Sequence, residues 1–285
     1  MTEADHEVAS PDITRRKNAG LSHAVDWTLA QPCERYGEAD AVVWATLLAR
    51  QRALLPGRAC DEFLAGLDAL DLPADRVPNF AAINDRLAAA TGWRIVAVPG
   101  LIPDLAFFAH LAERRFPVTW WLREPAQLDY LPEPDLFHDL FGHVPLLTNP
   151  VFADYLQAYG RGGLKASHLH ALPMLARLYW YTVEFGLIDT PAGLRIYGAG
   201  ILSSRGECRD CLDSPTPQRI GFDVRRIMRQ LYHIDRYQDT YFVIDDFVQL
   251  FDATAPDFTP YYAELAALPE LAPGALLADD RRIAI

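Results

Sequence analysis

The sequence predicts a mainly helical α+β fold: a single compact helical domain with a few short antiparallel strands. Among the 285 residues, 51% are hydrophobic and 22% are charged, and neither Gly nor Pro recurs with a period. This composition is typical of one globular chain with a large core, and it excludes disordered, collagen-like and coiled-coil proteins. Segments with helical spacing of apolar residues outnumber strand-like segments, which do not alternate with helices as a parallel sheet requires.

Helices are predicted to fill the first third of the chain. Apolar residues recur at helical spacing from Glu38 to Leu55, where Pro56 stops the pattern. A second helix carries four apolar residues, Phe63, Leu64, Leu67 and Leu70. The third begins after Asn79, a residue type that caps helix N-termini, and ends at Gly92, the residue type that most often follows a helix.

Two short strands are predicted next, followed by a mostly helical remainder. Residues 93–98 are rich in β-branched side chains and end at Pro-Gly, which favours a strand running into a loop; residues 118–121 are the second candidate. Between them, Asp104 can cap a helix that continues through Arg115. A short helix is expected to start at 132–135, and further helices are predicted at 152–159, 173–187, 223–231, 246–251 and 261–268.

Charge and hydropathy exclude several classes of partner. The chain has 26 basic and 38 acidic residues, a formal net charge of −12, which repels nucleic acid and anionic lipid. The longest uncharged stretch, 140–153, is interrupted by Pro145 and Pro150, so we expect no membrane span. Residues 1–6 are acidic and polar, unlike a signal peptide, and this favours a cytoplasmic protein.

The four cysteines are too few and too scattered for a disulfide framework. Cys208 and Cys211 have the spacing of zinc ligands or of a redox pair, but no second such pair completes a tetrahedral site. We therefore interpret all four cysteines as incidental thiols.

A carboxylate lies inside the predicted 173–187 helix. Apolar and aromatic residues occupy nearly all sides of this helix, so it should be buried and Glu184 with it. An ionised buried carboxylate is costly unless it is paired or bound to a cation. Two interpretations remain open at this point: an ion pair with Arg177, or a metal ligand.

Two histidines strengthen the metal interpretation. His138 and His143 lie in the apolar sequence PDLFHDLFGHVP. Residues five apart on an ideal α-helix diverge by about 140°, so the pair converges only if the backbone distorts, for example near Gly142. Two neutral imidazoles and one carboxylate suit a facial triad with open positions on iron(II). Zinc accepts the same atoms, so the residue types alone do not name the metal.

Three blocks of the sequence resemble signature motifs of the pterin-dependent aromatic amino acid hydroxylases: FHDLFGHVPLL at 137–147, TVEFG at 182–186 and YGAGILSS at 197–204. Three shorter blocks match as well: GLIP at 100–103, RRFPVTWWLR at 114–123 and CLDS at 211–214. In order and spacing the resemblance covers roughly residues 11–260. It is strongest to the short bacterial phenylalanine 4-hydroxylases.

The resemblance implies a metal site and a pterin site. It assigns His138, His143 and Glu184 as the protein ligands of a non-haem Fe(II), with Tyr179 close to the iron; a purely structural place in the core is the alternative for Tyr179. For the pterin, the implied residues are Phe107, on which the ring stacks, Gly100 and Leu101, whose backbones offer hydrogen bonds, and Asp139. Animal members carry Glu at the Asp139 position, so the carboxylate is retained but shortened.

The resemblance also implies an amino acid site. Arg123 matches the residue that clamps the substrate carboxylate, where a bidentate pair is the expected geometry; the alternative is a surface salt bridge with Glu124 or Asp129. Other matches surround the substrate backbone and ring: Trp180, Ser203, Gly200, Pro134 and His138.

The implied function is that of a phenylalanine 4-monooxygenase. Such an enzyme converts L-phenylalanine to L-tyrosine with O2 and tetrahydrobiopterin or a related tetrahydropterin at Fe(II). Tryptophan or tyrosine hydroxylation within the same family is the first alternative. A zinc hydrolase and a non-catalytic amino acid or pterin binding protein are the others.

The predicted organisation is a polar N-terminal tail at 1–20 that orders only by lying on the domain, a catalytic domain at 21–270 and a C-terminal tail at 271–285. Animal members carry a C-terminal oligomerisation helix with apolar heptads. Residues 272–285 contain Pro273, Gly274 and two adjacent aspartates without heptads. We therefore expect a monomer.

Overall fold

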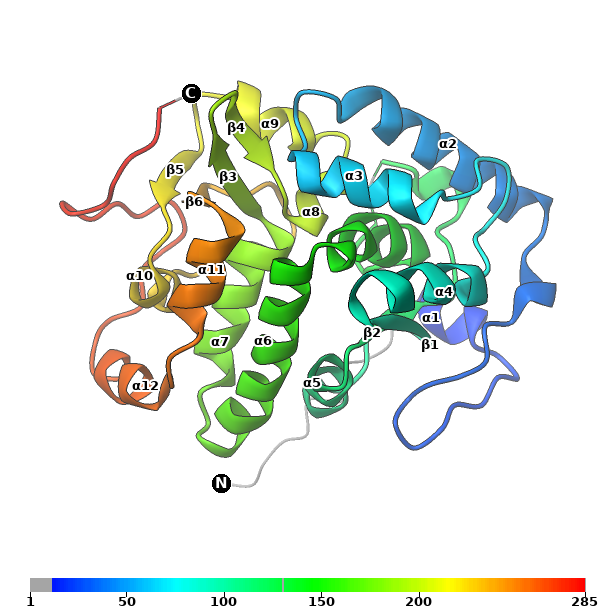
Figure 1. The fold of residues 1–285 in the computed structure, drawn as a ribbon, viewed down its shortest axis with the longest axis horizontal. Coiled ribbons are helices and arrows are strands. Elements are labelled where there is room, and N and C mark those ends of the chain that lie inside the picture. Colours follow the sequence, from blue (N-terminus) through cyan, green and yellow to red (C-terminus); the bar gives the residue numbers. More distant parts are fainter. Residues whose placement is uncertain (1–11, 130, 285) are drawn as a thin grey trace.

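Helices enclose two small sheets, and the elements of the first half of the chain lie together around β1 and β2 (Figure 1). The computed structural model describes residues 12–129 and 131–284. The elements of this half are α1 (Asp12–Lys17), η1 (Cys33–Arg35), α2 (Glu38–Leu54), α3 (Asp61–Leu70), α4 (Phe80–Thr91), β1 (Arg94–Val98), α5 (Asp104–Ala112), β2 (Arg115–Thr119), η2 (Pro125–Gln127), η3 (Phe137–His143) and η4 (Val144–Thr148).

The second half of the chain contains the longest helix and the larger sheet. Its elements are α6 (Pro150–His168), α7 (Leu172–Tyr179), η5 (Trp180–Glu184), β3 (Gly186–Thr190), β4 (Gly193–Ile196), α8 (Ala199–Leu202), α9 (Glu207–Asp213), β5 (Gln218–Gly221), α10 (Val224–Arg229), β6 (Thr240–Ile244), α11 (Phe247–Thr254) and α12 (Thr259–Leu265). The predicted helix-rich single domain with small sheets is confirmed.

The pairing direction of the strands corrects the prediction of antiparallel strands. β1 pairs with β2 in parallel, with Arg94 opposite Arg115. The four-stranded sheet has the order β4-β3-β6-β5, and both β3–β6 and β5–β6 are parallel. Among the named strands of the described residues, only β3 and β4 pair antiparallel. The reason is connectivity: α5 carries the chain from β1 back to the start of β2, a crossover that produces parallel strands.

Most predicted helices are present, with shifted ends. The Asn79 side chain accepts a hydrogen bond from the N–H of Ala81, and Gly92 adopts the left-handed conformation, so both predicted caps of α4 are confirmed. Asp104 is not the cap of α5, because Pro103 holds that position. The helix predicted to reach Arg115 ends at Ala112, since β2 begins at Arg115 rather than at 118.

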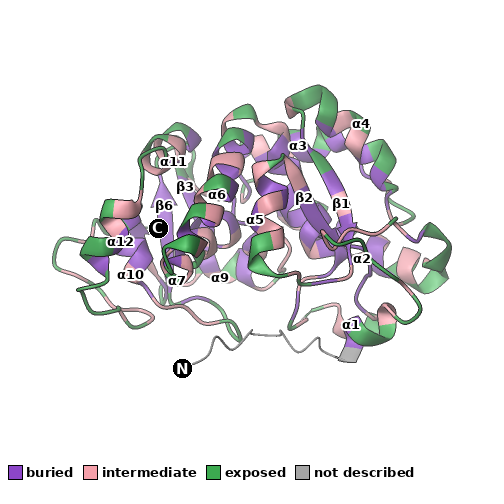
Figure 2. Cartoon of the chain, turned by 90° about the horizontal axis from the view of Figure 1, so that it is seen from below, coloured by how far each residue is buried: buried purple, intermediate pink, exposed green. Residues whose placement is uncertain are grey.

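The longest helix, α6, packs closely on α5. A Cβ on Gly160 would lie 2.5 Å from the backbone nitrogen of Ala112, and a Cβ on Gly163 would overlap the ring of Phe108. Gly162, between them, has nothing within 4 Å of its Cβ position. Figure 2 shows the same division, with purple inner faces and green outer faces along the helices. Glycine is therefore required for packing at two of these three positions.

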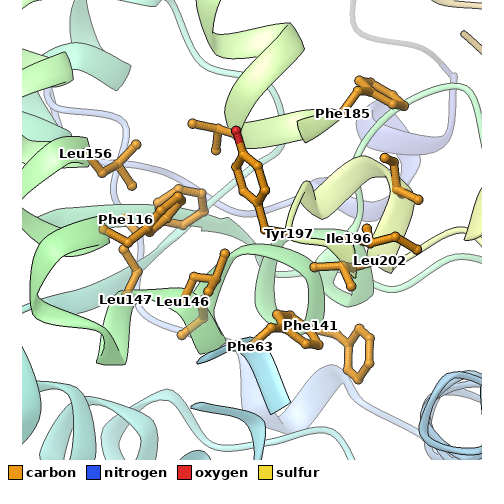
Figure 3. Close-up of a cluster of buried hydrophobic side chains, with 14 of the residues drawn as sticks. Phe63, Phe116, Phe141, Leu146, Leu147, Leu156, Phe185, Ile196, Tyr197 and Leu202 are labelled. Atoms are coloured by element: carbon orange, nitrogen blue, oxygen red, sulfur yellow. The ribbon is translucent and has the colours of Figure 1, made fainter. Parts of the chain in front are cut away.

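An aromatic cluster supports the segment that contains the two histidines. Phe141 lies edge-on to Phe63 of α3 with ring centroids 5.8 Å apart (Figure 3). It also stacks on Phe137, with ring centroids 4.7 Å apart. Leu146 and Leu147 of η4 belong to the same cluster and are almost fully buried. The histidine segment is thus packed against the core on its apolar side.

The described parts of both end segments that were predicted as tails, 12–20 and 271–284, contact the domain. Residues 1–11 are outside the described residues, but Ile13 and Thr14 of α1 are buried. Near the other end, Asp280 forms a buried ion pair with Arg226 at 2.9 Å, and the N–H of Ile283 donates to the carbonyl of Arg219. No helix of the described residues is long and apolar enough to cross a membrane.

The four cysteines are free thiols. Cys60, Cys208 and Cys211 are buried and Cys33 is exposed. Burial raises the pKa of the Cys208 thiol to about 12, and this thiol donates to the carbonyl of Ile201. A buried thiol that stays protonated is a poor metal ligand or redox group.

We predict opposite effects for alanine at two neighbouring glycines of α6. Gly160→Ala should lower the free energy of unfolding by roughly 1–3 kcal/mol, because the added methyl group meets the backbone of α5. Gly162→Ala should be neutral or stabilise by up to about 1 kcal/mol, since only helix propensity changes there. Urea unfolding followed by circular dichroism measures both. Equal stabilities of the two variants would contradict the packing.

Candidate metal centre and active site

His138 and His143 converge because their segment is a π-helix. In the π-helix η3 the backbone hydrogen bonds link residue i to residue i+5, so side chains five residues apart lie on nearly the same face. This is the distortion that the sequence required near Gly142. A Cβ at Gly142 would lie 2.9 Å from the carbonyl oxygen of Ala199, so glycine lets η3 pack against α8.

Glu184 lies at the end of a second π-helical segment. The helix predicted at 173–187 is α-helical only to Tyr179; η5 then continues it, and the N–H of Phe185 donates to the carbonyl of Trp180 at 2.8 Å. Gly186 begins β3, which corrects the predicted helix end. A Cβ at Gly186 would overlap the ring of Tyr197, so the chain leaves the helix through a tightly packed glycine.

The three side chains form one cluster of possible metal ligands. The Nε2 atoms of His138 and His143 are 3.2 Å apart. The Glu184 carboxylate lies 3.1 Å from Nε2 of His143 and 3.5 Å from Nε2 of His138. Across the described residues, this is the one group of three or more His, Cys, Asp or Glu side chains whose ligand atoms all lie within 4.8 Å.

The competing ion pair between Glu184 and Arg177 is wrong. The Arg177 guanidinium donates to the carbonyl of Met228 at 2.8 Å and pairs with Glu270. Glu184 is therefore left with the two imidazoles and with the N–H of Gly200, which donates to its carboxylate.

A serine fixes the tautomer of His138. The Ser203 hydroxyl donates to the carbonyl of Ala199 at 2.8 Å, so its oxygen must accept the hydrogen bond from Nδ1–H of His138 at 2.9 Å. The lone pair of Nε2 then faces the other two ligands. Hydrogen bonds of this kind orient metal-binding imidazoles in proteins.

The electrostatics suit a cation at the point where the three groups meet. Burial lowers the pKa of His138 to about 4, so this imidazole is neutral at physiological pH. Burial opposes the charge on Glu184, yet His143, His138 and the N–H of Gly200 hold the pKa of its carboxyl below the usual value. Two imidazoles and one carboxylate form the donor set of non-haem iron(II), and a bound metal replaces the proton that His143 and Glu184 share.

Arg123 is paired, but with neither of the residues considered from the sequence. Its Nε and NH2 groups donate to the two oxygens of Asp135 at 2.8 and 2.9 Å, and both residues are buried. Glu124 pairs with Arg16 and Asp129 with Arg50 instead. On the NH1–NH2 edge of Arg123, NH1 donates to the carbonyl of Leu128 only at 3.5 Å, so this edge is the part of the guanidinium that a ligand can engage.

Asp135 is the functional residue that the sequence analysis missed. Its Oδ1 atom also accepts the N–H of His138 at 3.1 Å. Asp135 thus connects the arginine to the first histidine and caps the start of their helix. An aspartate directly before a helix, whose side chain accepts the N–H three residues later, is the usual N-cap signal. This signal could have identified Asp135.

The residues assigned to the pterin lie around the loop that follows β1. Gly100 has a φ of 152°, a conformation that favours glycine, and Leu101 is 53% exposed. The half-buried Phe107 ring meets Tyr179 edge-on at 5.7 Å. Asp139 accepts the N–H of Thr119 at 2.7 Å, and burial raises the pKa of its carboxyl to about 7.

The residues assigned to the amino acid lie on several elements. Trp180 begins η5 and is half-buried, and Pro134 is half-buried directly before Asp135. Gly200 and Ser203 lie on or beside α8, where they bond to Glu184 and His138 respectively. Tyr179 lies between Phe107 and His143, with its ring centroid 6.3 Å from the imidazole.

We predict that Ser203→Ala weakens metal binding about 10–100-fold, because His138 loses the hydrogen bond that fixes its tautomer. Calorimetric titration of the metal-free protein with Fe²⁺ under anaerobic conditions measures the dissociation constant. Ser204→Ala is the matched control, since the Ser204 hydroxyl accepts from the N–H of Glu207 and not from a histidine. An unchanged Fe²⁺ affinity in Ser203→Ala would argue against the orienting role.

Comparison with known proteins agrees with the motifs. The family described as biopterin-dependent aromatic amino acid hydroxylase matches residues 2–259. A phenylalanine-4-hydroxylase of Chromobacterium violaceum is 69% identical over 271 residues, which is 95% of this chain and 91% of that protein. One of Ralstonia nicotianae is 66% identical over 255 residues, 90% of this chain and 82% of that protein.

Solved structures match along nearly the whole chain. The cobalt-bound phenylalanine hydroxylase of Chromobacterium violaceum has a TM-score of 0.95 at 68% identity and covers 96% of this chain and 99% of its own. The iron- and phenylalanine-bound structure from the same organism has a TM-score of 0.93 at 66% identity, covering 96% and 100%. With the convergent His138, His143 and Glu184, these matches show that the chain belongs to the biopterin-dependent aromatic amino acid hydroxylases.

Proposed function

We propose that this chain converts L-phenylalanine to L-tyrosine with O2 and a tetrahydropterin at Fe(II) held by His138, His143 and Glu184. The observation that carries the proposal is the convergence of these three ligand atoms within 4.8 Å. Identity of 69% to a phenylalanine-4-hydroxylase supports phenylalanine as the substrate. When bound, the iron and the tetrahydropterin supply the oxygen-activating chemistry, and the protein supplies binding and orientation.

Phe107, Gly100, Leu101 and Asp139 bind tetrahydrobiopterin or a related tetrahydropterin in this proposal. The Phe107 ring offers a face for stacking, held in place by the edge-on contact with Tyr179. The backbones of Gly100 and Leu101 offer hydrogen bonds to the heterocycle. The N–H of Thr119 holds the Asp139 carboxyl group at the end of β2, where we assign it to the pterin.

The amino acid is oriented from two directions. The NH1–NH2 edge of Arg123 clamps the substrate carboxylate, because Asp135 occupies the other edge and holds the guanidinium still. Trp180, Pro134 and the His138 ring form the wall for the aromatic ring. Gly200 and Ser203 act on the substrate through Glu184 and His138, to which they are hydrogen-bonded.

Assembly and cellular location remain predictions from the sequence. We expect a cytoplasmic monomer, and the net charge of −12 disfavours nucleic acid and anionic membranes as partners. Light scattering of the purified protein measures its mass.

The first test supplies anaerobically iron-loaded protein with a tetrahydropterin, O2 and each of phenylalanine, tryptophan and tyrosine. We predict tyrosine from phenylalanine as the main product in chromatography, and no product with zinc in place of iron.

His138→Ala, His143→Ala and Glu184→Ala should each lose iron and product together, because three protein ligands on one face of the iron are the minimum for this kind of site. Full iron content with normal turnover in any of these variants would show that the ligand assignment is wrong.

A separate prediction concerns the substitution Arg123→Lys. Lysine retains a charge beside the buried Asp135, which an alanine would leave unpaired, but it lacks the planar fork. We expect phenylalanine affinity to fall roughly 10–100-fold, the loss of one charge-assisted hydrogen bond, with iron content unchanged. Calorimetry on the iron-loaded protein measures this affinity.

Arg177→Lys is the matched control for Arg123→Lys. Arg177 is equally buried and paired with a carboxylate, but its partners are Glu270 and the carbonyl of Met228. This control should bind phenylalanine like the unmodified protein. Equal phenylalanine affinities in the two variants would show that Arg123 only forms a structural ion pair and does not bind the substrate.

A further inference from the structure

We propose that Gln238 is a positioning residue for the substrate pocket: it holds the indole of Trp180 and thereby sets the wall against which the substrate ring lies. Gln238 belongs to the 232–238 loop, which joins α10 to β6. The inference rests on the proposed function in one respect, because it takes Trp180 to contact the substrate.

The orientation of Trp180 is set by the 232–238 loop as well as by its own helix. Its indole stacks on the ring of Tyr232, with centroids 4.2 Å apart and an interplanar angle of 14°. Phe185 contacts it at 4.6 Å, and a Cβ at Gly200 would lie 2.8 Å from the Phe185 ring. The indole Nε1–H donates to Oε1 of Gln238 at 3.1 Å. The loop therefore provides both the stacking partner and the hydrogen-bond acceptor.

Gln238 can present only its oxygen to the indole. Its Nε2 group donates to the carbonyls of His233 at 2.8 Å and Arg236 at 3.3 Å, and the side chain is almost fully buried. A reversed amide would place its oxygen against two carbonyls and its NH2 group against the indole N–H. The Gln238 amide is therefore bonded at its nitrogen to the backbone of the loop and at its oxygen to the indole of Trp180, so the shape of the loop sets the position of Trp180.

Glu207 fixes the backbone of Gln238 from the other side. The Oε1 atom of Glu207 accepts the N–H of Gln238 at 3.2 Å and the hydroxyl of Tyr241 at 2.8 Å. Because Glu207 lies in α9 and Tyr241 in β6, the inner end of the loop is attached to two elements.

The loop is also closed on itself. The Arg236 guanidinium, which can only donate, is 3.3 Å from Nδ1 of His233, so Nε2–H of His233 donates to Asp239 at 3.1 Å. The outer side chains face solvent, with Ile234 77% and Tyr237 48% exposed. The hydrogen bonds among Arg236, His233 and Asp239 thus close the loop on its exposed side, while the buried amide of Gln238 faces Trp180.

The positioning role is separable from metal binding. Glu184 is held by the two histidines and by Gly200, and none of these contacts involves the loop. A change at Gln238 should therefore move Trp180 and alter phenylalanine binding while iron content stays constant. A purely structural glutamine would instead affect stability, or all of these properties together.

The test compares Gln238→Leu with Gln157→Leu. Gln157 is the matched control, because it also accepts one N–H, from Arg114, and donates to one carbonyl, that of Ala112. The first readout is the indole ¹H–¹⁵N spectrum of the six tryptophans, in which Trp180→Phe identifies the Trp180 signal. We expect this signal to shift in Gln238→Leu and to keep its position in Gln157→Leu.

The second readout is kinetic. Gln238→Leu should raise the KM for phenylalanine roughly tenfold, about the effect of one lost hydrogen bond, with a much smaller change in kcat and unchanged iron content. In the Trp180→Phe background the same substitution should add little, because the indole N–H is already absent. Additive effects on KM in this double-mutant cycle would overturn the proposal, as would a shifted indole signal with an unchanged KM.

Gln238→Glu keeps the inference testable if Gln238→Leu does not fold. Glutamate retains an acceptor for the indole but loses both donors to the loop, so the Trp180 signal should broaden or shift on loosening of the loop while the hydrogen bond persists. A signal and a phenylalanine affinity identical to those of the unmodified protein would reject the link. Failure of the unmodified, iron-loaded protein to hydroxylate phenylalanine would instead reject the proposed function, which the indole spectrum does not test.

Discussion

The metal site depends on two π-helical turns. An α-helix would direct His138 and His143 to different sides, and the i to i+5 repeat of η3 brings them together. The irregular backbone is stabilised by its surroundings: Phe141 packs on Phe63, and Gly142 lies against α8. In η5 the same repeat ends the helix at Glu184. The geometry of the candidate ligands therefore depends on the aromatic core beneath them, because residues distant from any ligand hold that backbone in place.

Two short connections join the metal site to the substrate site. Asp135 bonds both to Arg123 and to the N–H of His138, so the proposed carboxylate clamp and the first histidine share one anion. α8 lies between the two ligand-bearing helices, with Gly200 bonded to Glu184 and Ser203 to His138. The resemblance assigned Gly200 and Ser203 to the substrate, whereas their hydrogen bonds run to metal ligands. A few side chains therefore connect the candidate metal ligands to the residues proposed to bind the substrate.

Features that depend on residues close together in the chain, such as helices and their caps, were predictable from the sequence. The α4 helix had strong periodicity together with caps at Asn79 and Gly92, and all of these are present. The four-stranded sheet was missed, because its strands are four or five residues long and β3 follows directly from a helical pattern through Gly186. Residue chemistry gave the ligand types, but only the resemblance chose among their interpretations. The partner of Arg123 was not predictable from neighbours in the chain, since Asp135 reaches it through tertiary structure.

Local charge explains how an acidic protein accommodates this substrate. The chain has a net charge of −12, yet the charges of Arg123 and Asp135 cancel each other and His138 is neutral. Burial raises the pKa of Asp139 to about 7, so this carboxyl group is only partly ionised, and a divalent ion bound at Glu184 would leave a positive balance in the proposed site. An amino acid carries no net charge, so the acidic surface does not repel it at a distance. Inside, the positive balance attracts its carboxylate, and burial strengthens that attraction by excluding water. The same burial lowers the pKa of His138 to about 4 and keeps this imidazole unprotonated and ready to bind a metal.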